Sequence, residues 1–361
     1  MKAVVLVGGE GTRLRPLTYS TPKPLLPIGN QPFLERQLEW LAGYGVDEVV
    51  LAIGYLPDAF DQHFPEHEYA GVKLRYRVES EPLGTAGAIR FAAEGIDERI
   101  VVCNGDVLTT LDLGELVAFH EKTGADASIA LTHVDEPSAF GVVPTFPDGE
   151  VRGFVEKPPR GKAPTKWINA GTYVLEPSVL AAVPPRLQVS IERTTFPRML
   201  DRRGRMYAVQ SDAYWIDIGT PGKYLEAHTD LLAGKIGAPP APGAVETGPG
   251  VWVQGDVDVH ADAQLFAPLL LGAGCVIEAG AVVRGSSIGA GAHVEAGAEV
   301  VRSVVLDGAT VGPDVRLLDS VLGADARIGV GGSATNETVI GADSVIAAGS
   351  LLSNARVPAE G

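Results

Sequence analysis

Cysteine is nearly absent from this chain, which has only Cys103 and Cys275 among 361 residues. Both lie in apolar segments far apart in the sequence, so we expect two small buried side chains and no disulfide or metal site. No apolar run approaches the ~18 residues that a membrane-spanning helix needs, and the first residues lack the apolar stretch of a signal peptide. We therefore expect a soluble cytoplasmic protein without a membrane partner.

Positive charge is also scarce, because 29 Lys and Arg stand against 45 Asp and Glu, which gives a formal net charge of −16. This balance argues against nonspecific binding to nucleic acid, so an anionic substrate would need a local cluster of cations. The sequence also lacks a Cys/His or Ser/His/acid arrangement in an activating context, which favours direct displacement over a covalent intermediate. The length predicts two domains.

The chain begins with an apolar run, Ala3 to Val7, that we interpret as a buried strand. A glycine-rich turn, Gly8 to Gly11, follows, and the cations Arg13 and Lys23 come soon after. Exposed backbone N–H groups beside guanidinium and ammonium groups are a candidate phosphate site, although many such turns only connect elements. The turn lacks the Gly-Lys-Ser/Thr ending of a phosphate loop, and Leu14 departs from the dinucleotide fingerprint.

Strands and helices alternate after this turn, which predicts right-handed βαβ units and a largely parallel sheet. In such sheets ligands bind at the carboxyl ends of the strands, so we expect the glycine turn, the turn at 79–87 and Asp106 at one edge. A more β-rich stretch to about Leu232 extends this into a mixed, Rossmann-like sheet. Its predicted strands are 128–134, 151–155, 168–175 and 207–210, and a helix at 111–122 carries His120 at its edge.

A segment rich in Ala, Pro and Gly at 234–250 is a linker by composition. Beyond it one aliphatic residue recurs every six positions, the pattern of a left-handed parallel β-helix built from hexapeptide repeats. We therefore predict a catalytic domain at 1–233, the linker at 234–250 and a β-helix at 251–361. The predicted inward positions include Leu265, then Leu270, Val276, Val282, Ile288, Val294 and Val300, with five-residue steps between blocks.

Carboxylates end two of the predicted strands, at Asp106 and Asp217. Each could simply cap a helix or make a turn, but two strand-end carboxylates near a phosphate site are what Mg²⁺ requires, because it completes its octahedron with phosphates and water. Glu156 and Lys157 form another strand-end pair, either an ordinary surface ion pair or groups that contact sugar hydroxyls and a phosphate. Asn169 is either a turn residue or a hydroxyl ligand.

These motifs, taken in order, resemble the sugar-1-phosphate nucleotidyltransferases over nearly the whole chain. The resemblance rests on eight stretches, which are Gly8 to Thr18, Pro22-Lys-Pro24, Glu81-Pro-Leu-Gly-Thr-Ala-Gly87, Asn104-Gly-Asp106, Phe140-Gly-Val-Val143, Phe154-Val-Glu-Lys-Pro158, Asn169-Ala-Gly171 and Trp215-Ile-Asp-Ile-Gly219. The segment 81–87 is similar to the guanylyl branch, which implies GTP and mannose 1-phosphate as substrates.

The resemblance also implies a role for each residue. The nucleotide would be held by Leu6, Gly8, Gly9, Gly11, Thr12, Arg13, Pro82, Gly84, Thr85, Asn104 and Asp106, with Pro82, Gly84 and Thr85 against the base. The sugar phosphate would be held by Gly141, Glu156, Lys157 and Asn169. Arg13, Lys23 and Lys157 would act in catalysis, and Asp106 and Asp217 would hold Mg²⁺. A homo-oligomer is also expected.

Three alternatives stay open at this point. The chain could use another sugar, such as a glucose or heptose 1-phosphate, because these differ from mannose 1-phosphate only by a hydroxyl or a side arm. It could be a regulatory homologue that binds nucleotide sugar without turnover, although Arg13, Lys23, Asp106, Lys157 and Asp217 are all present. It could also be a hexapeptide-repeat acyltransferase with a histidine base, but the tail has no long inserted loop to build an acyl-carrier site.

Overall fold

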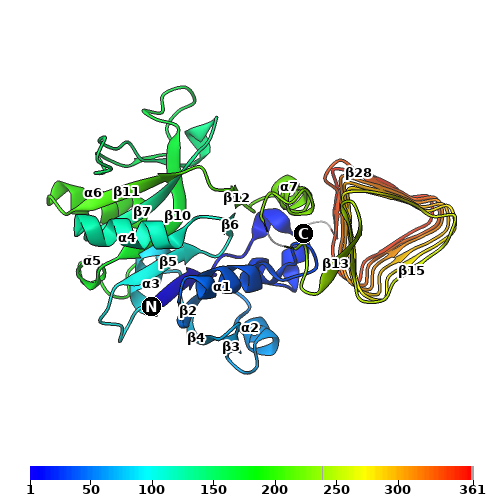
Figure 1. Cartoon of the computed structure of the whole chain (residues 1–361), viewed down its shortest axis with the longest axis horizontal. Coiled ribbons are helices and arrows are strands. Elements are labelled where there is room, and N and C mark those ends of the chain that lie inside the picture. The colour runs from blue at the N-terminus through cyan, green and yellow to red at the C-terminus, as the bar shows by residue number, and fades with distance from the viewer. Residues whose placement is uncertain (238, 359–361) are drawn as a thin grey trace. The chain divides into compact units, whose positions relative to one another are not determined.

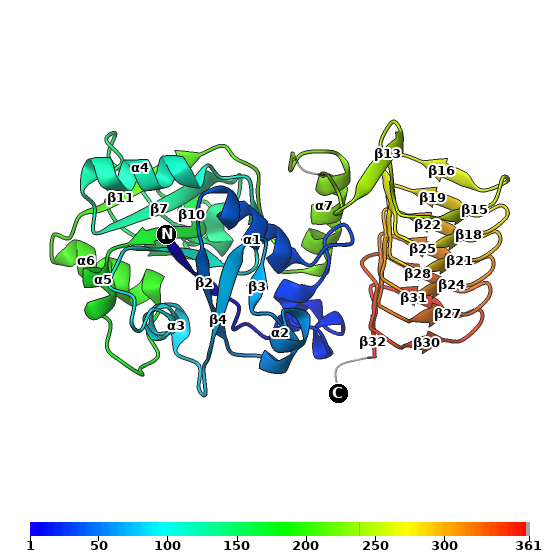
Figure 2. The same cartoon turned by 60° about the horizontal axis from the view of Figure 1, so that its bottom comes forward.

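The computed structural model describes residues 1–237 and 239–358. They fall into two compact units, each described here by itself (Figures 1 and 2). The first unit consists of Met1–Glu10 and Leu34–Trp215, and the second of Gly11–Phe33 with the chain from Ile216 onward. The second unit therefore combines a short N-terminal segment with the C-terminal part of the chain.

The first unit is built on a mixed sheet with the strand order β11-β7-β10-β5-β1-β2-β4-β3. Neighbours are parallel from β5 through β1 and β2 to β4, whereas β10 is antiparallel to both β5 and β7. The strands of this sheet are β1 (Lys2–Leu6), β2 (Glu48–Ile53), β3 (Glu68–Tyr69), β4 (Val72–Val78), β5 (Ile100–Asn104), β7 (Ala127–His133), β8 (Gly141–Val142), β9 (Val155–Glu156), β10 (Trp167–Leu175) and β11 (Met206–Ser211), while β6 (Val107–Thr109) lies outside it. The predicted mixed α/β sheet is confirmed.

Helices cover both faces of this sheet, with α3, α5 and α6 on one face and α4 on the other (Figure 2). Because both faces are covered, the central strands are apolar along their whole length, as in Ala3, Val4 and Val5, which have no exposed surface. The helices are α1 (Phe33–Gly43), α2 (Pro57–His63), α3 (Gly84–Ala92), α4 (Leu113–Thr123), α5 (Pro177–Ala181) and α6 (Phe196–Asp201), and a π-helical turn, η5 (Ile191–Thr195), precedes α6.

Two local predictions in the first unit are wrong. The strand expected at 151–155 is reduced to an isolated bridge at Val151 and the two-residue β9. His120 does not lie at the edge of its helix but is 1% exposed, with ring nitrogens 2.9 Å from Ser128 Oγ and 3.2 Å from Glu176 Oε1. Both partners come from other elements, which is why helix periodicity alone did not indicate the burial of this side chain.

The second unit contains a β-helix whose coils stack as three parallel sheets of short strands (Figure 2). The unit also contains three 3₁₀ turns, η1 (Thr12–Leu14), η2 (Leu17–Tyr19) and η3 (Lys23–Leu25), and the helix α7 (Pro221–Leu232). The strand β12 (Trp215–Asp217) crosses from the first unit into the second. Within 234–250 the chain forms β13 (Ala244–Gly248), which pairs antiparallel with β14 (Val251–Gln254).

Each of the three sheets of the β-helix contributes one strand to nearly every coil. The first sheet continues from β14 through β17 (Leu269–Leu271), β20 (Ser287–Ile288), β23 (Val304–Val305), β26 (Val321–Leu322) and β29 (Val339–Ile340) to β32 (Arg356–Val357). The second contains β15 (Asp258–Val259), β18 (Val276–Ile277), β21 (His293–Val294), β24 (Thr310–Val311), β27 (Arg327–Ile328) and β30 (Val345–Ile346). The third contains β16 (Gln264–Phe266), β19 (Val282–Arg284), β22 (Glu299–Val301), β25 (Arg316–Leu318), β28 (Ser333–Thr335) and β31 (Leu351–Ser353).

The predicted six-residue register holds from Ile288 onward but is wrong by one residue in the coil before it. There Leu271, Ile277 and Val283 form the core, while Val276 and Val282 are partly exposed. Each of these core residues has an aliphatic neighbour on its N-terminal side, so the period alone could not select which of the two points inward. The five-residue step therefore lies between Val283 and Ile288.

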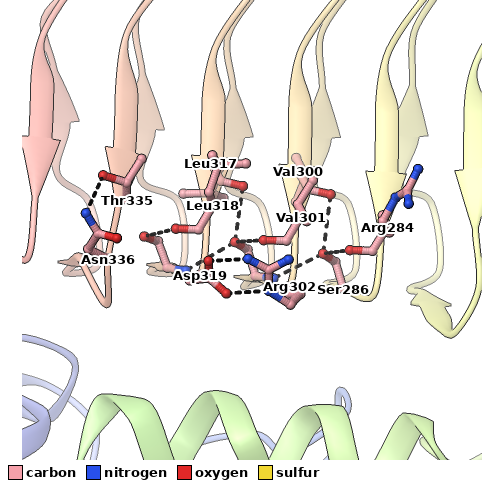
Figure 3. Close-up of polar contacts among 12 residues, drawn as sticks. Arg284, Ser286, Val300, Val301, Arg302, Leu317, Leu318, Asp319, Thr335 and Asn336 are labelled. Atoms are coloured by element: carbon pink, nitrogen blue, oxygen red, sulfur yellow. Dashed lines mark hydrogen bonds and ion pairs between the residues drawn. The ribbon is translucent and has the colours of Figure 1, made fainter.

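One corner of the β-helix is stabilised by stacked serines at the same position in successive coils (Figure 3). Ser286, Ser303 and Ser320 are almost fully buried. Two of these hydroxyls accept a bond from the backbone N–H of the next serine: Ser303 N donates to Ser286 Oγ over 3.1 Å, and Ser320 N donates to Ser303 Oγ over 3.2 Å. These bonds satisfy backbone groups that would otherwise be buried without partners at the corner.

Candidate active site

The carboxyl ends of the parallel strands of the first unit bring several predicted residues to one edge. Leu6 ends β1 and pairs in register with Asn104, which ends β5. Gly105 N donates to Leu6 O over 2.9 Å, so the turn that carries Asp106 is held against the end of β1. Glu79 follows β4, the second neighbour of β1 in this parallel arrangement. The predicted edge is therefore confirmed for the residues of this unit.

Close backbone contacts explain two of the glycines at this edge. A Cβ on Gly105 would lie 2.5 Å from Leu6 O, and one on Gly8 would lie 3.3 Å from Gly54 N. Gly9 has open space around the same position within the described residues. The backbone after β1 is thus packed on one side and bare on the other, which suits close approach of a ligand to main-chain N–H groups.

The loop predicted to lie against a base begins α3 and is fixed by side-chain hydrogen bonds. The Glu79 carboxylate accepts from Leu83 N over 3.0 Å. Burial raises the pKa of Glu79 above its usual 4.5, and the bond from Leu83 offsets part of this shift. Gly84 has a φ of +66° and could not carry a Cβ, because the atom would lie 2.8 Å from Val189 O.

Thr85 connects this loop to the π-helical turn η5. Its hydroxyl accepts from Ile191 N over 2.7 Å and donates to Glu192 Oε2 over 3.1 Å. Ser190 Oγ donates to the same Glu192 oxygen over 3.0 Å. The position of Pro82 and Gly84 therefore depends on a segment about 107 residues away in the sequence.

The residues predicted to hold the sugar phosphate lie together in the first unit. Gly141 of β8 pairs with Glu156 of β9, and a Cβ on Gly141 would lie 3.0 Å from Glu156 Oε2 and 3.9 Å from the Asn169 Cβ. Lys157 follows directly and has a φ of +49°, an unusual conformation for a bulky residue. Its N–H donates to Phe140 O over 3.0 Å, which holds this strained position.

Tyr173 and Arg193 orient this cluster and were not identified from the sequence. Asn169 Nδ2 donates to Tyr173 Oη over 2.8 Å, and its Oδ1 accepts from Gly171 N over 2.8 Å. Burial, followed by the nearby Glu192 charge, raises the pKa of Tyr173 well above 10.0, so its hydroxyl stays protonated. Arg193 Nη2 lies 3.6 Å from Glu156 Oε1. Arg193 follows Glu192, so η5 contacts both the loop at 82–85 and this cluster.

The remaining predicted residues lie in the second unit, where three of them are close together. Lys23 Nζ is 3.9 Å from Asp217 Oδ1. Gly219 packs closely against both Arg13 and Asp217. A Cβ at this position would lie 2.7 Å from Arg13 Nη2 and 3.1 Å from Asp217 Oδ1. Gly11 precedes Thr12 and has a φ of +62°, and Thr18 Oγ1 donates to its carbonyl over 3.0 Å. The structure thus groups the predicted site residues in two sets, one in each unit.

The segment that carries Arg13 and Lys23 is anchored on the β-helix of its own unit. Asn30 has a φ of +57°, and its Nδ2 donates to Ile288 O over 2.9 Å. His228 of α7 is 3% exposed and lies 3.1 Å from both Pro27 O and Ser287 Oγ. Gly29 N donates to His228 Nδ1 over 3.4 Å. Since a backbone N–H can only donate and a carbonyl oxygen can only accept, Nδ1 of His228 accepts without a hydrogen, and Nε2 carries the hydrogen that it donates to Pro27 O.

The two predicted metal ligands fit Mg²⁺ only in part. Asp217 ends β12, and Asp106 follows β5, so both carboxylates stand at strand ends. Among the described residues no group of three or more His, Cys, Asp or Glu side chains could hold a metal ion. A pair of carboxylates would need substrate phosphates and water to complete an octahedron. Asp106 belongs to the first unit and Asp217 to the second, so Mg²⁺ held by the two together stays a prediction.

The chain matches two family models. Residues 2–234 match the family described as "Nucleotidyl transferase", and residues 258–345 match "GlmU-like, C-terminal hexapeptide". A "Mannose-1-phosphate guanylyltransferase" of Mycobacterium tuberculosis is 41% identical over 239 residues, which cover 66% of each chain. A "Probable mannose-1-phosphate guanylyltransferase 1" of Oryza sativa is 39% identical, and the match covers 95% of this chain and 91% of the relative. The similarity therefore includes the β-helix.

Solved structures similar to this chain cover about two thirds of it. HddC from Yersinia pseudotuberculosis has a TM-score of 0.55 and 32% identity over 63% of this chain and 97% of its own, and it was also solved in complex with GMP-PN. A putative glucose-1-phosphate thymidylyltransferase from Bacillus anthracis has a TM-score of 0.57 and 25% identity over 63% of this chain and 94% of its own. Within the described residues there is no helix long and apolar enough to span a bilayer.

Proposed function

The chain belongs to the nucleotidyl transferase family and transfers a nucleotidyl group onto a sugar 1-phosphate; from this premise we propose that it makes GDP-mannose and pyrophosphate from GTP and mannose 1-phosphate. One observation carries the proposal. Relatives named mannose-1-phosphate guanylyltransferases align with about the whole chain, at 39% identity over 95% of it in the rice protein. The GMP-PN complex of HddC adds support for a guanine nucleotide.

We assign the nucleotide to the glycine-rich turn and the start of α3. Backbone N–H groups at Gly8, Gly9 and Gly11 would donate to the triphosphate, and Arg13 would hold the pyrophosphate as it leaves. The loop at 82–85 would lie against the base. Its attachment to η5 through Thr85 would keep it in one position during binding.

We assign the sugar 1-phosphate to the cluster around Glu156. Glu156 and Asn169 would accept and donate hydrogen bonds to sugar hydroxyls, and the bare Cα of Gly141 leaves room for the ring. Lys157 would hold the phosphate. One oxygen of that phosphate attacks the α-phosphorus of GTP in line, the new P–O bond forms, and the bond to the bridging oxygen breaks to release pyrophosphate. Alignment and neutralisation of charge would supply most of the acceleration.

Mg²⁺ would be held by Asp106 and Asp217 and would neutralise phosphate charge when bound. Lys23 Nζ lies 3.9 Å from Asp217 Oδ1, and its ammonium group would also donate to the phosphates. The cytoplasmic location and the homo-oligomer expected from the sequence remain predictions.

The decisive experiment measures pyrophosphate release for a matrix of nucleoside triphosphates against sugar 1-phosphates in the presence of Mg²⁺. GTP with mannose 1-phosphate should be the best pair. Asp106→Asn should abolish turnover, and Lys157→Ala should lower kcat/KM about a hundredfold, because it removes charge-assisted bonds to a phosphate. Lys162→Ala is the matched control, since Lys162 is exposed and has no assigned role.

The matrix also separates the alternatives. A best rate with a glucose or heptose 1-phosphate, or with dTTP, would replace the proposed substrates but keep the reaction class. Binding of GDP-mannose without pyrophosphate release from any pair would instead favour a regulatory homologue, and the proposed function would then be wrong.

A further inference from the structure

A cavity of about 300 Å³ lies in the first unit and is lined by residues of α5, η5 and α6. We call it the α5–α6 pocket. Its apolar walls are Val179 from α5, Val183 and Val189 from the segment between α5 and η5, and Met199 from α6. Its polar lining includes Thr194 and Thr195 of η5. None of the residues assigned to substrates lines this pocket, so the proposed reaction does not explain it.

Two arginines, Arg198 and Arg202, also line the pocket. They are four residues apart and exposed, and neither guanidinium has an ion pair or side-chain hydrogen bond within residues 1–237 and 239–358. The carboxylate of Asp126, which lines the pocket as well, is already engaged, because it accepts from Arg205 N over 2.9 Å. The two guanidinium groups are therefore available to an anion that enters the pocket.

The charge of this region differs from that of the rest of the chain. Residues 186–205 contain six arginines and two carboxylates, whereas the whole chain carries a net charge of −16. Electrostatic attraction of an anion would be concentrated here. A pocket with aliphatic walls and guanidinium groups is complementary to a molecule with an apolar body and an anionic head.

The pocket walls are bonded directly to the loop that we assign to the base. Val189 N donates to Leu83 O over 2.8 Å, and Ala86 N donates to Val189 O over 2.9 Å. At the other end of α3, Arg90 donates to the carbonyls of Leu180 and Val183. Both ends of α3 are thus held by residues in or beside the pocket walls.

The π-helical turn η5 forms a second connection between the pocket and the base loop. Thr194 and Thr195 line the pocket, while Glu192 of the same turn accepts from Thr85. Thr194 N and Thr195 N share one acceptor, Ser190 O, at 3.2 Å each. Such wide turns are rare and occur frequently at functional sites. A ligand that fills the pocket would therefore restrict η5 and, through it, Thr85.

We propose that the α5–α6 pocket binds a small organic phosphate with an apolar body, and that its occupancy changes the affinity of the loop at 82–85 for nucleotide. The phosphate would lie between Arg198 and Arg202, and the apolar body would contact Val179, Val183 and Met199. Binding itself does not depend on the proposed reaction. Only the effect on nucleotide affinity rests on the proposed function.

The test uses phenyl phosphate as the probe and isothermal titration calorimetry on the full chain. Benzyl alcohol, which lacks the charge, and inorganic phosphate, which lacks the ring, should bind at least about tenfold more weakly. Arg198→Gln with Arg202→Gln should weaken phenyl phosphate by about tenfold or more for the same reason. Ala182→Trp, at an exposed position of the lining, should block the pocket without disturbing the core.

The matched control is Arg186→Gln with Arg203→Gln, which removes the same charge from exposed positions that do not line the pocket. It should bind the probe as the wild type does. The pocket assignment is overturned if the wild type gives no binding heat at about ten millimolar probe, a range typical of weak fragments. It is also overturned if the two pocket variants bind with wild-type affinity, because the probe would then occupy the sugar phosphate site.

Kinetics test the second half of the proposal separately. Saturating phenyl phosphate should change the KM for GTP in the wild type and leave it unchanged in the Ala182→Trp variant. If the calorimetry shows pocket binding and this KM does not move, coupling to the base loop is wrong while the binding site stands. If no substrate pair turns over at all, the proposed function fails and the calorimetric result is unaffected.

Discussion

The hydroxyl of Thr85 can be removed with almost no change in side-chain shape by the substitution Thr85→Val. This change deletes the acceptor of the Ile191 N–H, which lies 2.7 Å away, and the donor to Glu192 Oε2 at 3.1 Å. Ile191 is 1% exposed, so water cannot replace the lost acceptor. A buried N–H without a partner costs about 1–3 kcal/mol, which corresponds to a fall in Tm of ~2–12 °C for a unit of this size.

The same substitution should raise the KM for nucleotide about tenfold, because Thr85 lies in the first turn of α3, which we assign to the base. Thr85→Ser is the control, since serine keeps the hydroxyl and loses only a methyl group. Differential scanning fluorimetry gives Tm, and a pyrophosphate assay at varied GTP gives KM. If the valine and serine variants match each other in both measurements, the bond to Ile191 does not hold the loop and the reasoning is wrong.

Three further predictions concern other parts of the chain. Gly141→Ala should raise the KM for the sugar 1-phosphate ~10–100-fold and leave the KM for GTP unchanged, because the new methyl would lie 3.0 Å from Glu156 Oε2; an equal rise in both constants would contradict it. Asn30→Ala should lower the free energy of unfolding by about 2 kcal/mol, because it removes the bond to Ile288 O and places alanine in a left-handed conformation. Asn30→Gly removes the same bond but tolerates this conformation, so urea unfolding should show that it recovers the conformational share of the loss. Burial lowers the pKa of His120 below 6.5, although Glu176 opposes the shift. The contribution of His120 to the free energy of unfolding should therefore be full above pH 6.5 and fall as the pH drops through the lowered pKa. Urea titrations should show a flatter pH dependence of this free energy for His120→Gln than for the wild type.

The edge of the sheet was predictable because parallel strands constrain where their ends lie. With Ala3 to Val7 and 100–103 interpreted as strands of one largely parallel sheet, the glycine turn and Asp106 were expected at the same edge. Glu192 and Arg193 lie in a polar stretch with no apolar period. Their contacts with Thr85 and Glu156 depend on how a single wide turn packs, which no local pattern encodes.

The β-helix shows the same division between what a period predicts and what packing decides. Six-residue spacing gave the architecture correctly, since each hexad forms one face of a coil. It could not select between Leu270 and Leu271, because both are aliphatic. In the structure Leu271 enters the core of the β-helix, whereas Leu270 packs with Leu232 and Ala241 outside it. Both leucines are therefore buried, one inside the repeat and the other against residues outside it.

The β-helix holds the segment that carries two of the predicted site residues. The segment at 11–33 groups with the C-terminal part of the chain rather than with the strand that precedes it. Asn30 is bonded to the backbone of the coil at Ile288, and His228 connects Pro27 to Ser287 of the same coil. Because Arg13 and Lys23 lie on that segment, the coil at 287–288 helps to position both cations. The repeat domain is therefore part of the framework that holds the side chains we assign to the phosphates.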